Sequence, residues 1–292
     1  MAVAEAYVSR PGRRGLSRVA SSRRVFTGAS HIDQAGLILL GVLVALAVFA
    51  PLIAPDNPII PSIPFTTPLH GGHLLGTDEV GYDIFSRILY GLRTSLIGVL
   101  IVVSSGVVIG GTIGLIAGVV GGWVDAVLMR ITDLFLALPG PLLAIAIAAA
   151  LGPSYAHVLL SVGIVWWPFY ARIMRGEIRA LGARPHVEAA ALAGAGTVRR
   201  GLRHLLPGAM PAIIVTASLD VGNLVVTLAG LSFLGLGAPA PAPELGAMAA
   251  RGLQFLLQQW WVPVMPSIAV ALLALGANLS GDAIADAMGL GT

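Results

Sequence analysis

Apolar residues occur in long blocks along this chain, and short polar or proline-rich segments separate one block from the next. A helix that crosses the hydrocarbon core of a bilayer needs about 20 mostly apolar residues, because each residue advances it by about 1.5 Å. Six blocks approach or exceed that length. They are residues 35–54, 94–120, 134–151, 155–170, 209–238 and 262–280. The pattern predicts an all-α, polytopic membrane protein with about six transmembrane helices.

The segments between these blocks define the domain organisation. Residues 1–34 form an arginine-rich N-terminal segment, and residues 35–292 form the transmembrane domain. Six prolines between residues 51 and 68 predict an extended connection. A cleaved signal peptide is a competing interpretation of the first block. However, its apolar run is longer than a signal h-region and five more blocks follow, so we expect a retained helix.

Composition supports the membrane assignment and excludes several chemistries. Hydrophobic residues make up 57% of the chain and charged residues 11%, whereas a soluble domain has about 25% charged residues. There is no cysteine, and all 17 basic residues are arginine. Disulfides, thiolate metal sites and a P-loop lysine are therefore excluded, and we expect no nucleotide hydrolysis by this chain.

The arginines also predict an orientation. If the N-terminus is cytoplasmic, fourteen of the 17 arginines fall on the inner side, as the positive-inside rule requires. We therefore expect both termini in the cytoplasm and residues 171–208 to be a cytoplasmic connection. The same distribution favours contact with anionic lipid over binding of nucleic acid.

A regular series of glycines predicts close helix packing. Glycine recurs every fourth residue in the second block, at Gly106, Gly110, Gly114 and Gly118. Residues four apart share one face of a helix, and glycine lets another backbone approach that face closely. We expect a ridge on which a second helix packs.

Functional residues concentrate in the long connection, residues 171–208. Glu188 lies near the start of an alanine-rich helix, where a negative charge suits the helix dipole, and Gly194 can end that helix. Val198, Leu202 and Leu205 then recur at helical spacing with arginines between them. The pattern predicts two short helices at a bend. An ordinary amphipathic helix on the membrane surface is the competing interpretation.

This connection resembles the EAA loop of ABC-importer permeases. Glu188, Ala189 and Ala190 are followed after three residues by Gly194, and after nine more by a His-x-Leu-Pro sequence that starts at His204. In that family the loop forms a coupling helix that docks on the cytoplasmic ATPase. The residues that the resemblance assigns to coupling are Glu188, Ala189, Ala190, Gly194, Arg199, Arg203, His204 and Pro207.

Four other segments, residues 75–96, 121–133, 231–237 and 278–282, are similar to C-type subunits of dipeptide and oligopeptide permeases. The resemblance implies a type I permease fold and half of a heterodimeric pore. Its expected partners are a second homologous permease, two ATPase chains and an extracytoplasmic substrate-binding protein. ATP and Mg²⁺ would be used by the ATPases, and no cofactor is expected on this chain.

Two further groups carry competing interpretations. Asp220 lies within the fifth block, where a carboxylate is costly, and with Asn223 it either lines the translocation path or makes a structural hydrogen bond. His70 and His73 lie in a Gly-Gly turn with no third ligand beside them, so we expect a surface loop and no metal. No pattern indicates catalytic residues.

The resulting prediction is a peptide-importer permease that couples to ATPases. A permease for nickel or another small solute is the first alternative, because nickel permeases share this subunit type. A secondary transporter is more distant, since it would show paired discontinuous helices and more intramembrane charges.

Overall fold

The computed structural model describes residues 31–289, and every regular element in that range is a helix. The arginine-rich segment, residues 1–34, lies almost entirely outside the described residues. The elements in chain order are α2 (His31–Val48), α3 (Ala50–Ile53), α4 (Ile84–Val120), α5 (Gly122–Leu136), α6 (Gly140–Leu151), α7 (Tyr155–Gly182), α8 (Pro185–Leu192), α9 (Thr197–Arg200), η1 (Gly201–Leu205), α10 (Leu206–Phe233), α11 (Leu245–Gly252), η2 (Leu253–Phe255) and α12 (Trp261–Ala287).

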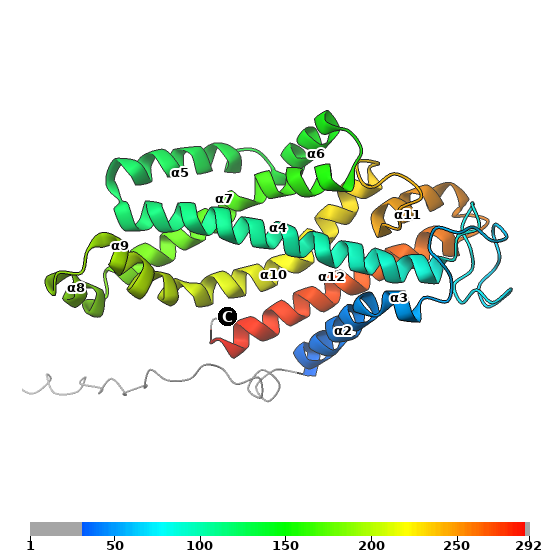
Figure 1. The fold of residues 1–292 in the computed structure, drawn as a ribbon, viewed down its shortest axis with the longest axis horizontal. Helices are drawn as coiled ribbons and strands as arrows, with labels where there is room; N and C mark the ends of the chain where they lie inside the picture. The colour runs from blue at the N-terminus through cyan, green and yellow to red at the C-terminus, as the bar shows by residue number, and fades with distance from the viewer. Residues whose placement is uncertain (1–30, 290–292) are drawn as a thin grey trace, which may run out of the picture.

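Four long helices, α4, α7, α10 and α12, run side by side along the long axis of the molecule, and α2 packs beside α12 (Figure 1). The short helices α8 and α9 lie at one end, which we call the α8–α9 end. The connection between α3 and α4, together with α11, lies at the opposite end, which we call the loop end. The predicted all-α, polytopic architecture is confirmed.

The number of crossings differs from a simple count of apolar blocks. Within residues 31–289, four helices are long and apolar enough to cross a membrane, and a bent pair raises the number to five. The bent pair is α5 and α6, which meet at 81°. Residues 134–151 are therefore not one straight helix, because Pro139 interrupts the apolar run and lies outside both helices. Helix α2 is apolar but has only 18 residues.

Helix α7 extends well past the apolar block that predicts it. It continues to Gly182, so the first part of the expected 171–208 connection is helical. This extension carries Arg175 and Arg179, which both bind Asp125 of α5. Ion pairs with a neighbouring helix continue α7 where hydropathy predicts an end.

The glycine series of α4 lies against α7. A Cβ atom on Gly110 would be 2.2 Å from the backbone oxygen of Trp167, and one on Gly114 would be 2.3 Å from that of Ala171. At Gly106 the added atom would meet the ring of Tyr170, and at Gly118 it would meet the side chain of Ile178. Backbone therefore contacts backbone along this helix pair, which only glycine permits.

Apolar packing forms two separate clusters. The larger one joins residues of α2, α4, α6, α7, α10, α11 and α12 in the middle and at the loop end. The smaller one lies near the α8–α9 end and consists of Met174, Ile178, Leu181, Val187, Leu205, Ala209 and Ile213. The short helices are thus attached to the bundle by packing of their own.

Substitution in the glycine ridge should show how much the close contact contributes. We expect Gly110→Ala to lower the thermal stability of the purified protein, because overpacking of this kind costs about 1–3 kcal/mol. Gly111→Ala is the matched control, since its added Cβ would have Met174 Cε as its nearest neighbour, at 3.5 Å. Thermal unfolding in detergent measures both. Equal melting temperatures for the two variants would contradict the ridge.

Candidate functional site

Helix α8 is defined by residues at both of its ends. Pro185 occupies its first turn, where the missing N–H costs nothing, and Glu188 adds a negative charge to the same turn. After α8, Gly194 adopts a φ of +82°, a conformation that favours glycine. The N–H of Ala195 bonds to the carbonyl of Ala190 over 3.0 Å and closes this turn. The chain then enters α9, so the predicted two short helices at a bend are present.

The surface of this segment combines apolar and charged groups. Leu192 is 91% exposed and Val198 is 72% exposed, while Glu188 and Ala189 are also exposed. Among residues 31–289 no salt bridge engages Glu188. An exposed leucine beside an unpaired carboxylate suits docking onto a protein partner, since interfaces join an apolar centre to a polar rim.

The remaining residues of the EAA-like motif lie farther along the chain. Arg199 and Arg203 are exposed, His204 is half-buried within η1, and Pro207 occupies the first turn of α10. Helices α9, η1 and α10 form one continuous run, Thr197–Phe233. The structure thus joins the second half of the motif directly to a membrane-crossing helix.

Val187 and Leu205 anchor the segment to the bundle. Val187 is 2% exposed and Leu205 is 6% exposed. Both pack in the smaller apolar cluster against Ile178 and Leu181 of α7 and Ile213 of α10. A force applied to α8 therefore acts on α7 and α10 through packed side chains.

Asp220 lies inside the bundle, where α10 faces α7. It is 6% exposed and accepts hydrogen bonds from the indole N–H of Trp166 and, over 3.0 Å, from the hydroxyl of Tyr170. The side chain of Asn223 also interacts with this carboxylate, although Asn223 itself is exposed on α10. Two donors from α7 compensate the burial of this acid. Sequence spacing suggests Asn223 as a partner but gives no sign of Trp166 or Tyr170.

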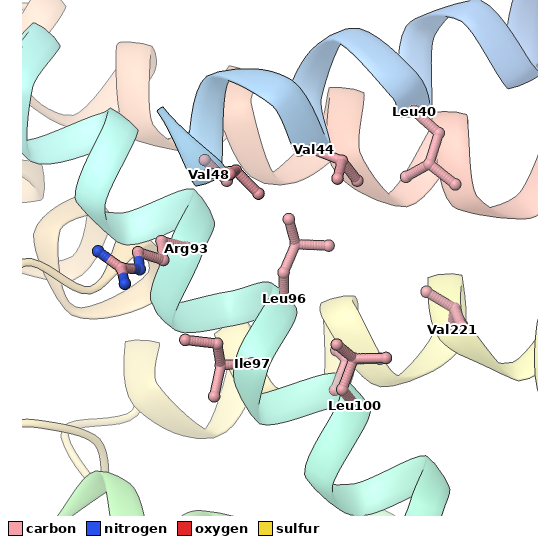
Figure 2. Close-up of a pocket in the computed structure, with 10 residues that line it drawn as sticks. Leu40, Val44, Val48, Arg93, Leu96, Ile97, Leu100 and Val221 are labelled. Carbon is pink, nitrogen blue, oxygen red and sulfur yellow. The ribbon is translucent and has the colours of Figure 1, made fainter. Parts of the chain in front are cut away.

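A groove of about 520 Å³ opens between α2 and α4, with α10 at its base (Figure 2). Nine of its ten lining residues are apolar, and Arg93 is the exception. Its chemistry suits acyl chains or an apolar helix and does not suit a zwitterionic peptide. The groove is separate from both Asp220 and the α8–α9 segment.

Two buried charges organise the loop end, and neither is marked by the sequence pattern. Arg87 is 1% exposed; it donates to the carbonyl of Pro58 over 2.8 Å and to that of Pro241 over 3.1 Å. Glu244 is 1% exposed and accepts from the N–H of Ala247 at the start of α11 over 2.9 Å. Burial raises the pKa of Glu244, and the hydrogen bonds from the N–H groups of Ala247 and Gly246 oppose that rise.

His70 and His73 do not act together. His70 contacts Thr67 and Pro68 at the surface. His73 turns inward and lies 2.9 Å from a carboxylate oxygen of Asp83. The two acids near His73, Asp56 and Asp83, are ten or more residues away in the sequence, so the residues around the turn do not predict them.

Residues 110–289 match the family model described as binding-protein-dependent transport system inner membrane component. The chain is 40% identical to the probable D,D-dipeptide transport system permease protein DdpC of Escherichia coli, over 88% of this chain and 87% of that protein. It is 39% identical to the dipeptide transport system permease protein DppC of Alkalihalophilus pseudofirmus, over 87% of this chain and 84% of that protein.

The di/tripeptide transport system permease protein DppC of Pseudomonas aeruginosa is also 39% identical, over 87% of this chain and 86% of that protein. The matches include the α8–α9 segment and every long helix from α7 onward. The chain belongs to the binding-protein-dependent transport system inner membrane components and is a multi-pass membrane protein of that family.

Proposed function

We propose that this chain is one of two permease subunits in an ATP-driven importer of di- and oligopeptides. The peptide assignment rests on the relatives named as dipeptide or di/tripeptide permeases, which match over most of their length and most of this chain. The exposed α8–α9 segment, packed onto two membrane-crossing helices, supports coupling to a separate motor.

In this proposal the chain is a non-catalytic subunit. It forms half of the translocation pore with a second homologous permease, and a substrate-binding protein delivers the peptide. Two ATPase subunits use ATP and Mg²⁺ and dock on the α8–α9 end through Glu188, Ala189, Ala190 and Gly194. The arginine distribution supports a cytoplasmic position for that end and for both termini.

The mechanism is alternating access. Closure of the ATPases displaces α8, and the smaller apolar cluster transfers this displacement to α7 and α10. Because these helices meet at Asp220, the rearrangement reaches the interior of the bundle. ATP binding thereby shifts the population from one pore orientation to the other.

Uptake of a labelled tripeptide tests the cargo. We expect cells that lack the gene to lose uptake and to regain it when the gene is restored. The control is a strain that retains this chain but lacks the ATPases, and it should also fail to take up the peptide. Unchanged peptide uptake in the deletion strain would contradict the peptide assignment, and nickel uptake would be measured next.

Charge reversal at Glu188 tests the docking role. We expect Glu188→Arg to insert normally but to reduce co-purification of the ATPase at least tenfold, which corresponds to about 1.4 kcal/mol. Glu177→Arg, the same change on α7 outside the α8–α9 segment, serves as the control. Retention of the ATPase by Glu188→Arg at the wild-type level would remove Glu188 from the docking surface.

Asp220 and Asn223 are the proposed polar residues of the translocation path. We expect Asp220→Asn to lower peptide uptake several-fold, because it removes the negative charge that a cationic peptide N-terminus would meet. Tyr170→Phe removes one hydrogen bond and leaves that charge in place, so its uptake should stay near wild type. Equal uptake by the two variants, measured at equal amounts of assembled complex, would assign Asp220 a structural role alone.

A further inference from the structure

Three side chains from separate parts of the loop end converge on one point. Asp56 follows α3, His73 belongs to the Gly-Gly turn, and Asp83 is the N-cap of α4. His73 Nδ1 lies 2.9 Å from Asp83 Oδ1 and 3.5 Å from Asp56 Oδ2. All three atoms fall within 4.8 Å of one another. The fold therefore assembles one imidazole and two carboxylates that are distant in sequence.

The contacts of Ser62 are compatible with a proton on the Nε2 atom of His73. The hydroxyl of Ser62 donates its single proton to the carbonyl of Gly81 over 2.8 Å. The same oxygen lies 3.2 Å from His73 Nε2, and in this arrangement it can accept from an Nε2–H group. In the neutral imidazole the other nitrogen, Nδ1, then presents a lone pair to both carboxylates.

Lone pairs at these distances repel one another unless a cation lies between them. Asp83 is 1% exposed and the side chain of His73 is 11% exposed, so water screens this repulsion poorly. Two cations fit the requirement, namely a second proton on the imidazole or a metal ion. Tetrahedral zinc with bonds of about 2.0 Å holds its ligand atoms about 3.3 Å apart, and the two separations from Nδ1, 2.9 Å and 3.5 Å, lie on either side of that value.

The surroundings have the form of a metal site. Metal-bound histidine and carboxylate groups use their second atom in a hydrogen bond that orients them. Here the Nε2–H of His73 bonds to Ser62, and Asp83 Oδ2 accepts from the N–H of Ser86 over 2.7 Å. The N–H of Asp56 in turn donates to the hydroxyl of Ser86 over 3.2 Å. Neighbours thus orient the side chains of His73 and Asp83, and Ser86 holds the backbone of Asp56.

A cavity of about 210 Å³ lies over the cluster and is lined by the three side chains together with Asn57 and Ser62. The side chain of Asp56 is 48% exposed, which leaves a route for an ion to enter and a position for a water ligand. Imidazole with carboxylates is a ligand set for zinc and related transition metals, whereas Mg²⁺ and Ca²⁺ prefer oxygen alone.

We propose that Asp56 Oδ2, His73 Nδ1 and Asp83 Oδ1 bind one zinc ion, which ties the connection between α3 and α4 to the N-terminus of α4. The ion is a structural staple at the loop end and is distinct from any transported cargo. The proposal does not depend on the peptide assignment.

Zinc binding by the purified full-length protein tests this site. The chain contains six histidines, so a tag without histidine is used, bound metal is removed with a chelator, and zinc alone is titrated back. We expect one zinc per chain for the wild type. We expect at least tenfold weaker binding for Asp56→Asn and His73→Gln, both of which retain Asp83 and the hydrogen bond by which its Oδ2 caps α4.

His70→Gln is the matched control, because His70 lies in the same turn but outside the cluster, and it should bind zinc as the wild type does. Zinc should also raise the melting temperature of the wild type and His70→Gln but not of the other two variants. If the wild type binds no more zinc than His73→Gln, the proposal fails and a proton on Nδ1 is the cation between these carboxylates.

Discussion

The close contact between α4 and α7 is the constraint on which the rest of the bundle depends. At Gly110 and Gly114 the backbones of the two helices meet without an intervening side chain. This approach places Tyr170 over Gly106 and directs its hydroxyl toward Asp220 of α10. The same side chain, Tyr170, thus links the contact with α4 to the hydrogen bond with α10. In lipid, where apolar surface offers no driving force between helices, such packing and a buried hydrogen bond supply the specificity.

The sequence predicts the helical class, most of the apolar crossings and the bend at Gly194, because each depends on residues close together in the chain. It fails where distant residues decide the outcome. Helix α7 passes residue 170 because its arginines bind Asp125 on α5, and hydropathy registers only that the stretch is polar. Pro139 is visible in the sequence and marks the break, but the sequence does not give the 81° angle between α5 and α6. The partners of Asp220 and of His73 are likewise brought together only by the fold.

Arg87 organises the loop end in a comparable way. A fully buried guanidinium is costly unless it is compensated. Here Nη1 donates to the carbonyls of Pro58 and Pro241, and the ring of Tyr82 lies 4.6 Å away. The Nε atom makes no hydrogen bond but lies 3.7 Å from Asp78 Oδ2. Those carbonyls belong to two connections that are far apart in sequence. One side chain thereby holds the α3–α4 connection and the segment before α11 against the start of α4.

The division of the apolar packing into two clusters has a thermodynamic consequence. Cooperative opening of a protein follows its packed units, and a small unit opens at a lower free energy than the whole molecule. The seven-residue cluster beneath α8 can therefore open, and its backbone amide hydrogens can exchange with solvent, while the larger cluster stays closed. If an ATPase acts at this point, as proposed above, the membrane interior does not have to loosen in each cycle. In the proposed mechanism, the local stability of the α8–α9 end would set how much of each displacement reaches the helices behind it.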